Sequence, residues 1–538
     1  MSETKLRRDV VPLDDNDVDD QQKDDAVEEG VTITDEGGVD DLTLDQLDSA
    51  KLSWWHIRAV LVAGIGFFTD AYDLFVINMC VPMIKYVYFD NHLPAVDEGF
   101  MKGTAVFGTL VGQLLFGIIA DHKGRSGVYG IELMLIIMGT IGATMAASPV
   151  RGMNIAAMIS IWRLVVGIGI GGDYPLSATI TSEFSTKGRR GTLMAAVFSM
   201  QGLGQLAGGL VSLMMLGIFK HSIQNDPYML DYVWRFIMGL GVIPAVATLY
   251  FRLTMPESPR YQKEKATLEQ QKDELNSSGH PSGPKKSGLR EFLDHFGQWK
   301  HGKVLLGTSL SWFLLDISYY GLTLNQSTII SSIGFAQKFP GDPYSTMLSL
   351  AQGNTLVTLM GLLPGYYFSV ALIDRWGRKP IQILGFVMLT ILMALISAFY
   401  FQLKQNHLWL FVLLYSLALF FFNFGPNVTT FIIPGEVFPT RYRSTGHGIS
   451  AAAGKAGAII ATYLFPEIVS VWPENGIQII MGIFAFVMAA GLGVTFLVPE
   501  TKGRSLEEIS EDVNVIETDR SKREKPGKEK LLGPNEEV

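Results

Sequence analysis

The sequence predicts an all-α membrane protein with twelve transmembrane helices in two pseudo-symmetric halves of six helices each. The first observation behind this prediction is composition: of the 538 residues, 48% are hydrophobic and only 18% are charged. Soluble proteins carry about 25% charged residues, so this chain is too apolar to belong among them. The other two observations are a series of apolar stretches of membrane-spanning length and an internal repeat.

Twelve apolar stretches are long enough to cross a bilayer as helices, which takes about 20 residues each. A long polar loop between the sixth and the seventh stretch separates the chain into two halves. The stretches lie near residues 57–82, 101–120, 128–147, 153–172, 191–218, 235–253, 302–325, 348–372, 380–402, 408–432, 446–468 and 476–498.

The distribution of basic residues predicts the orientation. Basic clusters follow the second, fourth, eighth and tenth stretches, and the long loop 254–301 is basic as well. Loops after odd-numbered stretches, such as 83–100 and 219–233, contain few lysines and arginines. Because positive charge is retained on the cytoplasmic side of membrane proteins, we expect both termini and the central loop in the cytoplasm.

An internal repeat relates the two halves. The motif Asp-x-x-Gly-Arg occurs twice with an offset of 253 residues, and a glutamate followed seven residues later by an arginine recurs at the same offset. Pro-Glu-Ser-Pro-Arg after the sixth stretch and Pro-Glu-Thr-Lys-Gly-Arg after the twelfth close the two halves. Such a repeat implies a substrate site near the midplane between the halves, with alternating access. The charged repeat residues, which we expect to latch the halves together on the cytoplasmic side, are Asp121, Arg125, Glu183, Arg190, Asp374, Arg378, Glu436 and Arg443.

These features predict five regions. Residues 1–50 contain 4 Lys/Arg against 17 Asp/Glu, a composition typical of disordered segments. We do not expect this leader to act as a secretory signal, because it lacks a basic start followed by an apolar core. The regions are an acidic disordered cytoplasmic tail (1–54), a first six-helix half (55–255), a cytoplasmic central loop (256–301), a second six-helix half (302–500) and a charged cytoplasmic tail (501–538).

The stretch 163–183 places ionisable groups in an apolar segment: Arg163, Asp173 and Glu183, with Tyr174 beside them. An ionised group at bilayer depth costs about 2.5 to 3.5 kcal/mol, so such residues usually face the inside of a bundle and serve a function. We interpret the stretch as one wall of a polar cavity, the alternative being a buried salt bridge that only holds helices together. The residues that allow close helix approach or loosen the helix here are Gly167, Gly169, Gly171, Gly172 and Pro175.

The repeat places further polar residues around the central axis. The offset takes Tyr174 onto Asn427, and it takes Gln201 to the position next to Lys455. We therefore expect all four in the cavity. Amides that merely bridge neighbouring helices are the alternative for Gln201 and Asn427.

The seventh stretch adds Trp312, Asp316 and Tyr320, spaced four residues apart and so stacked on one helical face. An aromatic stripe alone would indicate packing. A carboxylate between two aromatic residues needs either a proton or a partner, and Lys455 is the candidate partner.

A site with both a carboxylate and a lysine suits an anion that still carries protons, such as phosphate. The lysine attracts its charge, while Asp316 accepts hydrogen bonds from its P–OH groups. Sulfate carries no proton at neutral pH and offers Asp316 only repulsion. Tyr174, Tyr320, Trp312, Gln201 and Asn427 would donate to the remaining oxygens.

Carboxylates in membrane segments predict a proton relay. Asp70 and Asp73 lie three residues apart on neighbouring turns of the first helix. We expect them to lead protons toward Asp173, whose protonation would weaken its pairing with Arg163, and Glu132 is a further candidate. Structural pairing or helix capping is the alternative for each of these residues.

Several motifs resemble those of the major facilitator superfamily over about residues 55–505: the Asp-x-x-Gly-Arg loops, the Arg-x-Arg turn and the Pro-Glu-Ser-Pro-Arg ending. Gly-Gly-Asp-Tyr-Pro-Leu-Ser-Ala-Thr-Ile (171–180), Asn-Phe-Gly-Pro-Asn (423–427) and the run 436–450 resemble the fungal and plant proton-coupled inorganic phosphate transporters. The resemblance implies a major facilitator fold and a plasma-membrane symporter for phosphate and protons. It also implies a phosphate site lined by Tyr174, Gln201, Trp312, Asp316, Tyr320, Asn427 and Lys455.

Other readings remain open at this point. The same fold could carry an organic phosphate, such as a glycerophosphodiester, or a sugar or other small solute, or it could serve as a nutrient sensor. An enzyme is not expected, because the Gly-rich run lies inside a helix and no catalytic triad is present. The sequence suggests no cofactor, metal site or nucleic-acid partner, and the single cysteine, Cys80, excludes an internal disulfide.

Overall fold

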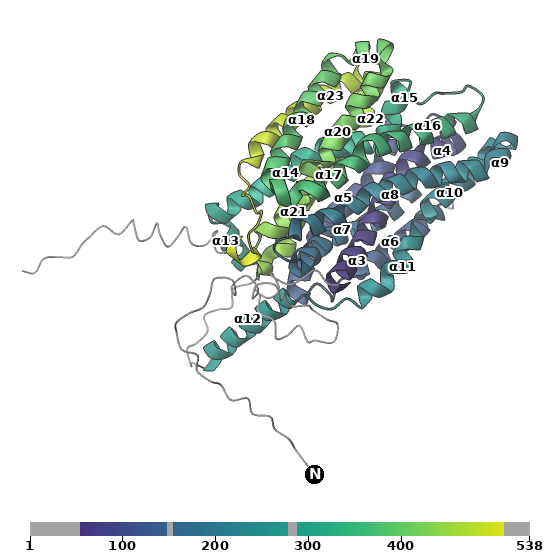
Figure 1. Cartoon of the computed structure of the whole chain (residues 1–538). Helices are drawn as coiled ribbons and strands as arrows, with labels where there is room; N and C mark the ends of the chain where they lie inside the picture. Colours follow the sequence, from purple (N-terminus) through teal and green to yellow (C-terminus); the bar gives the residue numbers. More distant parts are fainter. Residues whose placement is uncertain (1–53, 148–153, 278–287, 510–538) are drawn as a thin grey trace, which may run out of the picture.

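The computed structural model describes residues 54–147, 154–277 and 288–509, and within these ranges every element of regular secondary structure is a helix (Figure 1). The predicted acidic leader before Trp54, the linker at 278–287 and the tail after residue 509 lie outside the described residues.

The first half runs from α3 to α11 and fills one side of the bundle in Figure 1. Its helices are α3 (Trp54–Phe75), α4 (Ile77–Phe89), α5 (Ala95–Lys123), α6 (Ile131–Thr144), α7 (Ile155–Phe184), α8 (Arg190–Ile218), α9 (Lys220–Asn225), η2 (Pro227–Met229), α10 (Leu230–Gly239) and α11 (Val242–Leu253).

The second half runs from α14 to α23, on the other side of the bundle. Its helices are α14 (Trp299–Thr323), α15 (Gln326–Ser332), α16 (Pro343–Val357), η3 (Thr358–Leu362), α17 (Leu363–Trp376), α18 (Arg378–Ala398), α19 (Tyr400–Asn406), α20 (Leu408–Asn423), α21 (Pro426–Val437), η4 (Thr440–Tyr442), α22 (Arg443–Val471) and α23 (Gly476–Thr495).

The helices agree with the twelve predicted spans. Ten described segments are long and apolar enough to cross a membrane, α6 is a shorter apolar helix, and α14 supplies the remaining span. The prediction was least accurate for the fourth span: α7 continues to Phe184, twelve residues beyond the expected end at 172, and passes through Pro175 without a break.

Several spans are interrupted near the centre of the bundle. The first is divided at Val76 between α3 and α4, and the tenth between α20 and α21. The second break follows from the sequence, because Pro426 has no backbone N–H and therefore begins a helix more readily than it continues one.

Glycines set the close contact of α5 with α7. A Cβ on Gly167 would lie 2.0 Å from the Ala105 carbonyl oxygen, and a Cβ on Gly171 would lie 2.3 Å from that of Thr109. On the opposite face of α7, a Cβ on Gly169 would lie 2.5 Å from the Glu132 carbonyl oxygen of α6. The close approach expected from these glycines is confirmed.

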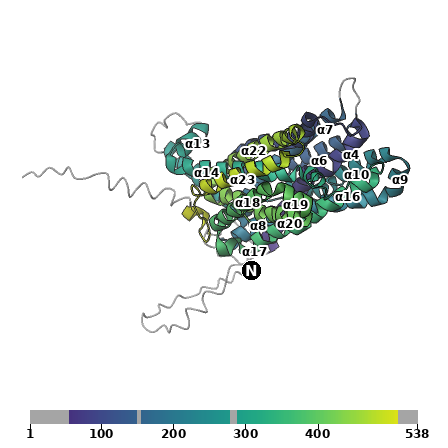
Figure 2. The ribbon, with the colours of Figure 1, turned by 90° about the horizontal axis from the view of Figure 1, so that it is seen from above.

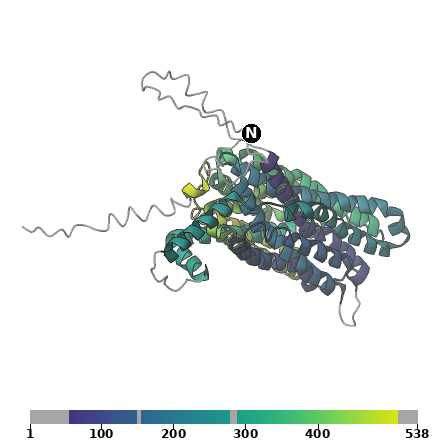
Figure 3. The same cartoon turned by 90° about the horizontal axis from the view of Figure 1, so that it is seen from below.

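The two halves meet where α5 packs on α22 and α8 packs on α17. The bundle is elongated, with α13 (Gly288–Phe296) at one end and α4 and α9 toward the other (Figure 2). Seen from below, the dark N-terminal helices run alongside the green C-terminal ones (Figure 3). The central loop forms α12 (Pro259–Ser277) and α13. Both helices lie at the end of the bundle that carries the Asp-x-x-Gly-Arg motifs.

Candidate functional site

The centre of the bundle holds a buried ion pair between helices of the second half. Lys455 Nζ of α22 lies 2.7 Å from Asp316 Oδ2 of α14, and both residues are 1% exposed. The second oxygen, Asp316 Oδ1, is buried and accepts no well-formed hydrogen bond from the described residues. The ion pair therefore engages only one of the two carboxylate oxygens of Asp316.

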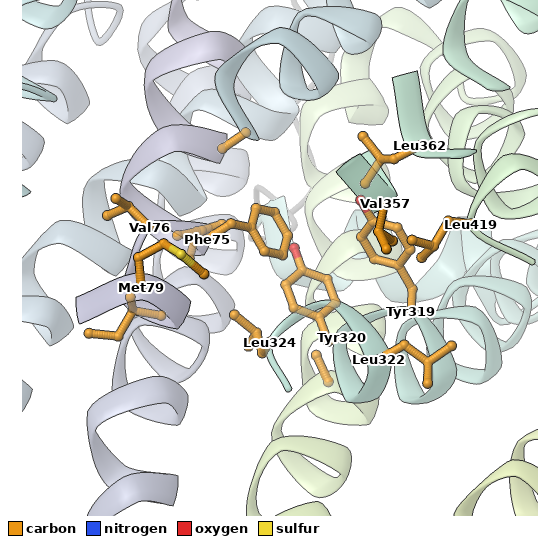
Figure 4. Close-up of a cluster of buried hydrophobic side chains, with 14 of the residues drawn as sticks. Phe75, Val76, Met79, Tyr319, Tyr320, Leu322, Leu324, Val357, Leu362 and Leu419 are labelled. Carbon is orange, nitrogen blue, oxygen red and sulfur yellow. The ribbon is translucent and has the colours of Figure 1, made fainter. Parts of the chain in front are cut away.

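Aromatic rings from both halves surround the ammonium group of Lys455. Its Nζ lies 4.5 Å from the ring centre of Tyr320, 5.2 Å from that of Tyr174 and 5.9 Å from that of Trp312. Ring faces attract a cation, so these contacts stabilise the charge that burial disfavours. Tyr320 also stacks on Phe75 of α3 (Figure 4), and the two ring centres are 5.8 Å apart.

The two amides predicted for the cavity occupy different places. Gln201 Nε2 donates to Tyr174 Oη at 3.2 Å and so joins the aromatic group directly. Asn427 Nδ2 donates to Tyr366 Oη at 3.1 Å and to Asn423 Oδ1 at 2.7 Å, so its hydrogen-bond partners belong to the second half. All seven residues expected to bind phosphate are at most 3% exposed, so the site is closed to solvent on both sides.

A second buried charge cluster lies in the first half, around Arg252 of α11. Its Nη2 lies 2.6 Å from Asp173 Oδ2, and its Nη1 lies 2.9 Å from Glu132 Oε1. All three side chains are 0% exposed. Ser177 and Tyr129 complete the surroundings, the former donating to Asp173 and the latter placing its ring 4.6 Å from the guanidinium carbon.

This cluster corrects the expected pairing of Asp173 with Arg163. Arg163 instead donates to three backbone carbonyl oxygens: Met101 at 2.8 Å, Asp73 at 3.1 Å and Leu74 at 3.3 Å. Its guanidinium group therefore holds the break between α3 and α4 against α5. Spacing along α7 did not indicate this, because residues ten apart lie almost three turns from each other.

The two aspartates of α3 face different neighbours. Asp70 interacts electrostatically with Asp173 and Arg252, and neither of its buried carboxylate oxygens accepts a well-formed hydrogen bond from the described residues. Asp73 accepts a hydrogen bond from Thr140 Oγ1 of α6 at 3.1 Å.

The charged repeat residues connect the halves at the end of the bundle near α12 and α13. Arg443 Nη1 of the second half lies 2.9 Å from Glu183 Oε1 of the first, and Glu183 also pairs with Arg125 at 3.2 Å. In the second half, Arg378 lies 2.7 Å from Glu436 and 2.8 Å from Asp374. Arg190, the fourth arginine of the repeat, donates to the Arg504 carbonyl oxygen at 3.1 Å.

Two aspartates of the repeat bind backbone N–H groups of the opposite half. Asp121 accepts from the N–H groups of Ser444 and Thr445 at the start of α22, at 3.2 and 2.7 Å. Asp374 accepts from the N–H of Thr192 at the start of α8, at 2.7 Å. Thr192 and Thr445 are themselves 253 residues apart, so the two contacts are equivalent under the repeat.

Comparison with known proteins places this architecture in a family. The chain matches the model for sugar (and other) transporters over residues 59–513. The chain belongs to the sugar (and other) transporter family. Its relationship to the fungal and plant inorganic phosphate transporters is confirmed by the relatives described next.

Among the relatives of this transporter is the repressible high-affinity phosphate permease of Neurospora crassa, 40% identical over 524 residues that cover 90% of this chain and 91% of that protein. Another is the inorganic phosphate transporter PHO84 of Saccharomyces cerevisiae, 42% identical over 515 residues that cover 87% of this chain and 86% of that protein. A probable inorganic phosphate transporter of Arabidopsis thaliana is 41% identical and covers 87% of this chain and 96% of its own length.

The solved structures similar to this transporter include the major facilitator superfamily proton:xylose symporter XylE bound to 6-bromo-6-deoxy-D-glucose. The TM-score is 0.65, with 85% of this chain and 98% of that chain covered and 21% identity. At this identity the likeness concerns the fold alone, and it confirms the major facilitator fold.

Sequence reasoning missed several polar residues of this transporter near the site. Tyr366 of α17 hydrogen-bonds Asn427, and Tyr319 of α14 accepts from Gln205 Nε2 of α8 at 3.2 Å. Arg252 was missed as well, although an arginine near the end of the sixth apolar stretch was a visible signal.

Proposed function

We propose that the protein is a proton-coupled symporter that imports inorganic phosphate by alternating access. The observation that carries the proposal is the buried Asp316–Lys455 pair, enclosed by rings of both halves. The chain containing it has relatives of about this length, at 40% and 42% identity, that are named phosphate permeases or transporters.

In this proposal phosphate binds between Lys455 and Asp316. Lys455 attracts the charge of the anion, and Asp316 Oδ1, which is not the oxygen paired with Lys455, accepts a hydrogen bond from a P–OH group. The hydroxyls of Tyr174 and Tyr320 and the indole N–H of Trp312 donate to the other oxygens. Gln201 and Asn427 hold the hydroxyls of Tyr174 and Tyr366 and so orient the donors around the anion.

The tight packing of this site favours a small anion. A Cβ on Gly454 would lie 2.5 Å from Trp312 Cδ1 and 2.9 Å from Asp316 Oδ2. Such a site leaves little room for the glycerol groups of a phosphodiester. A neutral sugar, in turn, would gain nothing from the charge of Lys455, which would stay paired with Asp316.

Proton coupling would use the cluster around Arg252. Protons pass from Asp73 and Asp70 to Asp173, and protonation of Asp173 weakens its ion pair with Arg252, not with Arg163. Glu132 then remains as the partner of Arg252. Because Asp173 and Tyr174 are adjacent on α7, a change at Arg252 reaches the phosphate site through one helix.

The conformational change would separate the charged network between the halves. In the closed arrangement Arg443, Glu183, Asp121 and Asp374 join the halves at the end near α12 and α13. Release of these contacts opens that end to the cytoplasm. The protein would lie in the plasma membrane with both termini cytoplasmic, and it would transport without acting as an enzyme.

The test is uptake of radiolabelled phosphate into proteoliposomes with an imposed inward proton gradient. The unaltered protein is compared with Asp316→Asn, and sulfate and glycerophosphate are added as competitors. We expect gradient-dependent uptake that is lost in Asp316→Asn and is unaffected by either competitor. Uptake that ignores the gradient would exclude the proton coupling, and strong competition by glycerophosphate would indicate an organic phosphate as substrate.

A further inference from the structure

A cavity of about 850 Å³ opens between the halves at the end of the bundle opposite the charged network. One half contributes α4 and the beginning of α5, and the other contributes α15, α16 and the end of α22. The cavity is large enough for a hydrated anion. Its charged lining residues are Lys85, Lys338 and Glu98.

Lys102 lies directly behind this lining. It is 2% exposed, and its Nζ lies 2.6 Å from Glu98 Oε1 and 3.0 Å from Asn325 Oδ1. Glu98 and Asn325 both line the cavity, so two cavity side chains converge on one buried ammonium group. An ammonium group has three N–H donors, and these two contacts use two of them.

The contact of Lys102 with Asn325 joins the two halves. Two further hydrogen bonds connect the halves next to it. Asn78 Nδ2 of α4 donates to the Thr323 carbonyl oxygen, and Ser327 Oγ donates to the Asn78 carbonyl oxygen at 2.8 Å. These contacts form the floor of the cavity. Asn325 follows Asp316 by nine positions, which corresponds to about 13 Å along a helix axis.

The charge of this region suits an anion. Lys85 lies near enough to Glu98 to interact electrostatically with it. Lys85, Lys102 and Lys338 stand against the single carboxylate of Glu98, which leaves two positive charges around the cavity. A cleft with one predominant charge concentrates ions of the opposite sign and speeds their binding.

We propose that Lys102 and Lys85 form an outer binding site for inorganic phosphate, at which the anion is held before it reaches Asp316 and Lys455. This inference rests on the proposed function. A phosphate oxygen accepts from the third N–H donor of the Lys102 ammonium group and another replaces Asn325, while Glu98 stays paired with Lys102. Once released, Asn325 no longer connects the two halves above the inner site. Phosphate bound at the outer site therefore allows the anion to pass on to Asp316 and Lys455.

The first test measures phosphate uptake kinetics of Lys102→Gln and Lys85→Gln. The matched control is Lys404→Gln in α19, a half-buried lysine at the same end of the bundle but outside the cavity. We expect kcat/KM to fall about tenfold in the first two variants, at the lower end of the range for electrostatic steering, with kcat little changed. Salt should lower kcat/KM of the unaltered protein more than that of the variants, because salt screens the attraction.

The second test measures equilibrium binding of radiolabelled phosphate to protein whose inner site is disabled by Asp316→Asn together with Lys455→Gln. We expect weak binding that remains in this protein and disappears when Lys102→Gln is added, whereas Lys102→Arg retains it. Elution of each variant in size-exclusion chromatography checks its folding, and Lys85→Gln on the cavity wall replaces Lys102→Gln if the latter does not fold.

The outcomes separate the two proposals. If the unaltered protein takes up no phosphate, the proposed function fails and the outer site fails with it. If it takes up phosphate but Lys102→Gln and Lys85→Gln match Lys404→Gln in kcat/KM and salt dependence, only the outer site is refuted. The outer site would also be refuted if the protein with Asp316→Asn and Lys455→Gln bound no phosphate.

Discussion

An alanine at Gly66 tests the buried cluster around Arg252. A Cβ at this position of α3 would lie 1.4 Å from Arg252 Nη2 and 2.3 Å from Asp173 Oδ2. Because Glu132 and Asp173 hold the two ends of the guanidinium group, Arg252 cannot move aside without losing a partner. The substitution should therefore break the pair of Arg252 with Asp173.

The size of the effect follows from two opposing terms. Removing one partner from a buried ion pair costs about 3 to 5 kcal/mol. Replacing a glycine inside a helix by alanine gains about 0.5 to 1 kcal/mol through the unfolded state. We expect Gly66→Ala to lower the free energy of unfolding by about 2 to 4.5 kcal/mol.

The control is Gly64→Ala, two residues earlier on the same helix. Its Cβ would meet Met200 Cγ at 3.0 Å, and this flexible side chain can move aside. Both variants share the gain in helix propensity, so their difference isolates the contact with Arg252. The assays are thermal unfolding of the purified protein and the pH dependence of phosphate uptake. Equal melting temperatures and equal pH profiles for the two variants would refute the reasoning.

Three further predictions concern other parts of the molecule. Asp173→Asn should leave phosphate binding measurable but abolish pH-driven uptake, and uptake with an unchanged pH profile would contradict the proton relay. Glu183→Gln should favour the state open to the cytoplasm. In a protein whose native Cys80 is replaced, the cysteine introduced by Thr179→Cys should then react faster with a thiol reagent added on the cytoplasmic side. Equal reaction rates with and without Glu183→Gln would count against the latch. Burial alone would raise the pKa of Glu507, but the charge and hydrogen bond of Arg260 hold this pKa below its ordinary value of 4.5. A lowered pKa contributes stability above 4.5 that is lost as the pH falls through the lowered value, so the unaltered protein should melt above Glu507→Gln at neutral pH and match it in stronger acid.

The sequence was sufficient to predict the helices and the symmetry of the bundle. Apolar length identifies a span without knowledge of its neighbours, and the 253-residue offset carried Tyr174 to Asn427 and Gln201 to the neighbourhood of Lys455. The pair of Asp316 with Lys455 could also be predicted, because an isolated carboxylate in an apolar helix requires a partner.

The partner of Asp173 could not be predicted in the same way. Arg163 and Arg252 are both arginines in membrane segments, and sequence distance favoured the former. The rotation of each helix decides between them, since it turns Arg163 toward the carbonyl groups near Leu74 and Arg252 toward Asp173. Helix rotation depends on packing, which the glycines of α7 control through contacts that a single sequence does not reveal.

The exchanged contacts of Asp121 and Asp374 have a consequence for the rate of transport. Each of these aspartates caps the first turn of a helix that belongs to the other half. When the halves separate, α22 and α8 lose their caps together, and a lost cap costs about 1 kcal/mol and lets the first turn fray. Amide hydrogens of Thr192 and Thr445 should then exchange with solvent only in the open state. Their exchange rates would report how often the protein without bound phosphate opens to the cytoplasm.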